Sequence, residues 1–72
     1  MYDDMMLDIY KRTLNNCEFY EKENKPLNLL NEIGVLRGVA YCLEAAGLDF
    51  AFNNSRFEHF IKVQQELKNA EG

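Results

Sequence analysis

The residues whose side chains could do chemistry are few and widely separated in the sequence. The chain has two cysteines, Cys17 and Cys42, and one histidine, His59. A nucleophilic site would need one of the thiols beside the imidazole, in surroundings that favour the thiolate. Both cysteines instead fall in apolar helical patterns, so we expect two reduced, buried core residues and no catalytic residue, with a disulfide between the two as the alternative. We expect the lone histidine to be a partly exposed structural residue.

The sequence also lacks the patterns of metal and phosphate sites. A zinc site needs about four ligands with short pairwise spacing, whereas the two cysteines and the histidine are scattered. The acidic group Asp3, Asp4 and Asp8 lacks the alternating oxygen ligands and the turn glycine of a calcium loop. Gly34 and Gly38 have the wrong spacing for a phosphate loop and fall inside a predicted helix. We therefore predict no metal, no cofactor and no enzymatic activity.

Length and charge narrow the class of protein. A chain of 72 residues is one small domain, and its core is marginal unless a partner or another device stabilises it. The formal net charge of −4 does not fit the basic surface of a nucleic-acid-binding protein. No secretory signal pattern and no run of about 18 uncharged apolar residues is present, which predicts a cytoplasmic protein without a membrane span.

The spacing of apolar residues predicts three helices and no strand, over about 3–23, 26–46 and 55–69. The first helix places its apolar residues on one face, because they recur every three or four positions. These residues are Met6, Ile9, Tyr10, Thr13, Cys17 and Tyr20. Pro26 fits the first turn of the second helix, and Gly47 fits the left-handed position after its last turn. We expect an all-α three-helix bundle with the second helix at its centre.

The second predicted helix is apolar nearly all round, which is typical of a buried helix. One of its faces is a ridge of small residues at four-residue spacing, Gly34, Gly38, Cys42 and Ala46. Such a ridge lets another helix approach closely, which would offset the cost of about 1 kcal/mol per glycine in a helix interior. The approaching helix belongs either to the same chain or to a second copy. The hydrophobic fraction of 47% favours a homodimer or higher homo-oligomer.

Two other pairs of residues are candidates for contacts with other molecules. The connector 48–52 is unusually apolar for a loop, so Phe50 and Phe52 either plug one end of the bundle or contact a partner. Arg37 and Tyr41 lie one helical turn apart and pair a base with an aromatic ring, which is the combination that a nucleotide-like ligand would use.

The segment from Asn31 to Gly47 resembles part of the short accessory proteins of Gram-positive phages and integrative mobile elements. The similarity covers under a quarter of the chain and implies a genomic setting more than an activity. Small acidic phage proteins of this kind include inhibitors that dock on host defence proteins and oligomeric sponges for signalling nucleotides.

These observations favour a non-enzymatic protein-interaction module that docks on a host protein and associates with itself. The first alternative is an oligomeric sponge for a small ligand such as a nucleotide. The second is a weak DNA-binding regulator, which the near-neutral charge of the third helix disfavours. No motif identifies the partner, the ligand or the oligomer number.

Overall fold

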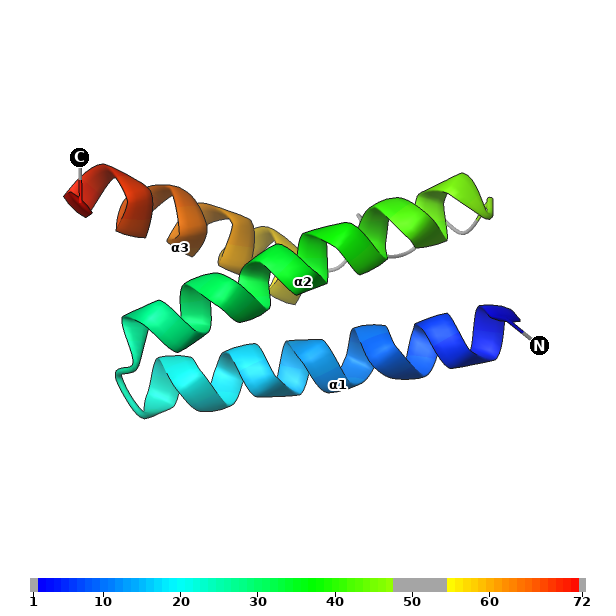
Figure 1. The fold of residues 1–72 in the computed structure, drawn as a ribbon, viewed down its shortest axis with the longest axis horizontal. Helices are drawn as coiled ribbons and strands as arrows, with labels where there is room; N and C mark the ends of the chain where they lie inside the picture. The colour runs from blue at the N-terminus through cyan, green and yellow to red at the C-terminus, as the bar shows by residue number, and fades with distance from the viewer. Residues whose placement is uncertain (1, 48–54, 72) are drawn as a thin grey trace.

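A computed structural model describes residues 2–47 and 55–71 of the chain, and these form three α-helices (Figure 1). Helix α1 spans Tyr2–Lys22, α2 spans Pro26–Ala45 and α3 spans Ser55–Glu71. The described ranges contain no strand, so the expected all-α three-helix fold is confirmed. None of these helices combines the length and apolar character that crossing a membrane requires.

Helices α1 and α2 form an antiparallel hairpin, and α3 packs against its side (Figure 1). The contact between α1 and α2 is the most extensive, and α3 contacts α2 more than it contacts α1. Helix α3 runs in the same direction as α1, toward the end of the molecule that holds the α1–α2 turn. The start of α1 and the end of α2 lie together at the other end.

The turn between α1 and α2 is closed by backbone hydrogen bonds. Asn24 has a φ of 56°, in the left-handed region that asparagine tolerates better than most residues. The amide of Lys25 donates to the carbonyl oxygen of Tyr20 at 3.0 Å. Pro26 then begins α2, where its missing N–H costs nothing, and the amide of Leu29 donates back to Lys25 at 2.9 Å. The short turn fixes α1 and α2 as neighbours.

The end of α2 follows the pattern expected from the sequence. Gly47 has a φ of 86°, which strains any residue with a Cβ, and its amide donates to the carbonyl oxygen of Glu44 at 2.9 Å. The amide of Ala46 donates to the carbonyl oxygen of Cys42 at 3.1 Å. The prediction of a left-handed glycine here is confirmed.

Helix α2 supplies half of the buried apolar residues among those described. The core consists of Tyr10, Leu14 and Cys17 from α1, Leu29, Ile33, Leu36, Ala40 and Leu43 from α2, and Phe57 and Phe60 from α3. Buried polar groups are paired, since the hydroxyl of Thr13 donates to the carbonyl oxygen of Ile9 at 2.7 Å and no buried side-chain N or O atom in the described ranges lacks a partner. The expected central place of α2 is therefore confirmed.

The prediction that α2 is buried on every side is wrong. Helices α1 and α3 pack on one half of its circumference, and the opposite half is exposed within the described structure. Cys42, expected in the core, lies on this exposed half, whereas Cys17 is wholly buried. Two neighbours cannot surround a helix, so an apolar pattern all round it leaves one face uncovered.

Candidate functional site

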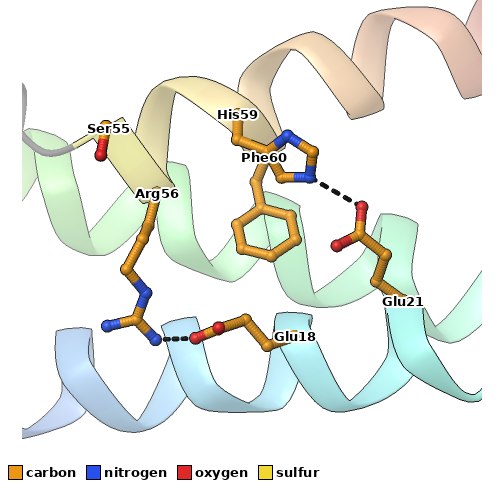
Figure 2. Close-up of a pocket in the computed structure, with 6 residues that line it drawn as sticks. All are labelled: Glu18, Glu21, Ser55, Arg56, His59 and Phe60. Carbon is orange, nitrogen blue, oxygen red and sulfur yellow. Dashed lines mark hydrogen bonds and ion pairs between the residues drawn. The ribbon is translucent and has the colours of Figure 1, made fainter.

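The polar groups that the sequence scatters are brought together in a groove between α1 and α3 (Figure 2). Arg56 forms an ion pair with Glu18 and donates to the side-chain oxygen of Asn15 at 3.1 Å. Nε2 of His59 lies 2.8 Å from a carboxylate oxygen of Glu21. The two acidic residues of α1 and the two basic residues of α3 thus have the same three-residue spacing, which matches because the helices run in one direction.

The polar residues that line this groove contact one another across the two helices. The phenyl ring of Phe60 lies between the Arg56–Glu18 ion pair and the His59–Glu21 contact in Figure 2 and packs edge-on against the imidazole of His59, with ring centroids 5.0 Å apart. The hydroxyl of Ser55 lies at the opposite end of the groove from the imidazole, so the drawn residues do not form a hydroxyl–histidine–carboxylate arrangement. These contacts hold α3 against α1. The sequence interpretation of His59 as a partly exposed structural residue agrees with this position.

The thiol of Cys17 is unsuited to nucleophilic chemistry. Its burial raises its pKa to about 12, and the negative charges of Glu32 and Glu21 act in the same direction. Because the thiolate is the reactive form, this thiol stays protonated and inert at neutral pH.

The candidate ligand pair Arg37 and Tyr41 is in contact on the surface of α2. The guanidinium lies 6.0 Å from the centre of the Tyr41 ring and donates to its hydroxyl at 3.2 Å. Its other terminal nitrogen donates to the side-chain oxygen of Gln64 on α3 at 2.9 Å. A ligand phosphate would have to displace these contacts, so the geometry favours a role for Arg37 in joining α2 to α3.

The exposed half of α2 is distinguished by the absence of charge. We define the outer face of α2 as Leu27, Asn28, Asn31, Gly34, Val35, Gly38, Tyr41, Cys42 and Ala45, all of them exposed. Helix α2 has three charged residues, and two of them, Glu32 and Arg37, are half-buried toward the other helices. The third, Glu44, is exposed two residues after Cys42 and so lies on nearly the opposite side of the helix. Solvent-facing halves of helices normally carry charged side chains.

The outer face of α2 borders an apolar groove between α1 and α2. The groove has a volume of about 410 Å³ and is lined by Met6, Ile9, Val35, Gly38, Val39 and Cys42. Ile9 and Val35 remain 40% and 49% exposed beside it. A recess with protruding apolar rims is the shape that accepts side chains of a second protein surface.

The glycines of the outer face are not required by the packing of the described residues. A Cβ built on Gly34 or Gly38 would meet no heavy atom of another described element within 4 Å. The alternative in which this ridge packs against a helix of the same chain therefore has no partner in the described structure. The ridge residues Gly34, Gly38, Cys42 and Ala46 are all exposed.

The structure describes some of the residues that the sequence suggested as contact residues and leaves others outside the described ranges. The small-residue ridge lies on one surface, together with Val35 and, across the groove, Ile9, which the sequence interpretation missed. The missing charge along α2 was the pattern that could have identified Val35, whereas Ile9 lies on α1 and is brought to the groove only by the packing of the two helices. Phe50 and Phe52 lie outside the described residues. No group of His, Cys, Asp and Glu side chains in the described ranges could hold a metal ion.

The comparisons with known proteins add no relative, since no family model, curated protein or solved structure matches the chain.

Proposed function

We propose that this protein is a non-enzymatic interaction module that binds another protein chain through the outer face of α2. The observation that carries the proposal is the pair of exposed glycines, Gly34 and Gly38, in the middle of an uncharged helix face. Alanine at these two positions would stabilise the helix by about 1 kcal/mol each. The described fold has room for it, so the glycines are better explained by the close approach of another chain.

The missing charge supports the same proposal. In the chain as a whole 28% of residues are charged, yet the outer face of α2 has no charged residue. The central part of a protein interface is depleted in charge, because a buried charge without a partner is costly. The face has this character over the length of α2, and the groove beside it, lined by Val35, Gly38, Val39 and Cys42 of this helix, has no charged residue either.

The partner is a second copy of the chain or a host protein. An acidic protein with a net charge of −4 suits a basic host surface around an apolar contact. The exposed thiol of Cys42 supports a cytoplasmic location, because free thiols persist in reducing compartments. A setting on a phage or mobile element stays a prediction from the sequence resemblance, and the neighbouring genes would test it.

The alternatives from the sequence have less support. For a nucleotide sponge, Arg37 would have to leave both Gln64 and Tyr41. For a DNA-binding regulator, α3 would have to present Arg56, which is already paired with Glu18.

Site-specific photocrosslinking tests the proposal. A benzophenone amino acid replaces Val35 on the outer face of α2, in the cells that naturally produce the protein. The matched control replaces Gln65, which is exposed on α3. We expect protein adducts from position 35 and few or none from position 65, because only the first lies in the proposed contact.

The outcome that contradicts the proposal is equally direct. If the variant labelled at position 35 folds normally, by its helical circular dichroism, and gives no more adduct than position 65, then the outer face of α2 is not a protein-binding surface. The mass of an adduct distinguishes a second copy of 8.4 kDa from any other protein.

A further inference from the structure

We draw no further inference here: the strongest candidate, the apolar groove between α1 and α2 beside the outer face of α2, belongs to the surface already described, and nothing in the described residues shows what covers it.

Discussion

Cys17 and Cys42 occupy similar apolar patterns in the sequence and opposite environments in the structure. Cys17 is wholly buried and Cys42 is exposed on the outer face of α2. In a Val35→Glu background, in which the outer face of α2 should stay uncovered, a thiol-specific reagent such as a disulfide dye should therefore label one thiol per chain within minutes in native buffer and two in denaturant. Cys42→Ala should abolish the native labelling. Rapid labelling of both thiols in the folded wild type would contradict the described core.

Stability should fall as the pH rises above about 9. Burial raises the pKa of Cys17 from 9.0 to about 12, so the folded state keeps a proton that the unfolded state releases in this range. Since the unfolded state then binds fewer protons, the free energy of unfolding decreases with pH between these values. Burial raises the pKa of Tyr10 as well, which adds to the decline at higher pH.

Urea denaturation at a series of pH values measures this decline. The Cys17→Ala variant is the control, because it lacks the thiol and should lose stability less steeply between pH 9 and 10. Equal slopes for the two proteins would show that Cys17 does not titrate differently in the folded state.

Gly34 and Gly38 should lower the stability of the folded chain and allow another chain to approach α2 closely. In a Val35→Glu background, which we expect to keep the chain monomeric, Gly38→Ala should raise the free energy of unfolding by about 1 kcal/mol. No described residue of another element lies within 4 Å of the added Cβ. Urea denaturation measures the change, with Gly47→Ala as a control that should destabilise because its φ is 86°. A destabilised G38A variant would show that the glycine is needed within the chain.

At the scale of elements, apolar packing rather than the ion pairs should hold α3 in place. Phe60 is buried, and its replacement by alanine should cost about 3–5 kcal/mol, which approaches the whole stability of a small domain. Arg56 and Glu18 form an exposed pair, whose loss in Arg56→Ala should cost about 0–1 kcal/mol. Urea denaturation of both variants makes the comparison. A larger loss for R56A than for F60A would contradict this account.

The elements themselves were predictable from local patterns. Apolar residues at three- and four-residue spacing, Pro26 and Gly47 are local features, so the helix ends of the structure lie within two residues of those expected. The exposure of Cys42 was not predictable in this way, because it depends on which side of α2 the helix α3 occupies. The match of Glu18 and Glu21 with Arg56 and His59 likewise becomes visible only once the direction of α3 is known.

At the scale of the whole molecule, the fold leaves one long side of its central helix uncovered by described residues. Helices α1 and α3 bury one half of α2 and leave an uncharged half that contains two glycines. A chain of 72 residues has a marginal core, and covering this side with another protein would add to its stability through mass action. Binding of the partner would then stabilise the fold of this chain.

Sedimentation velocity over a wide range of protein concentration tests the central claim most directly. We expect a dimer for the wild type and for Gln65→Glu, and a folded monomer for Val35→Glu and Gly38→Glu, because each of the last two would bury an unpaired charge in the contact. Circular dichroism confirms that the monomeric variants are folded. Glu variants of the outer face that associate as strongly as Q65E would contradict it, and a wild-type chain that stays monomeric at high concentration would exclude a second copy as the partner.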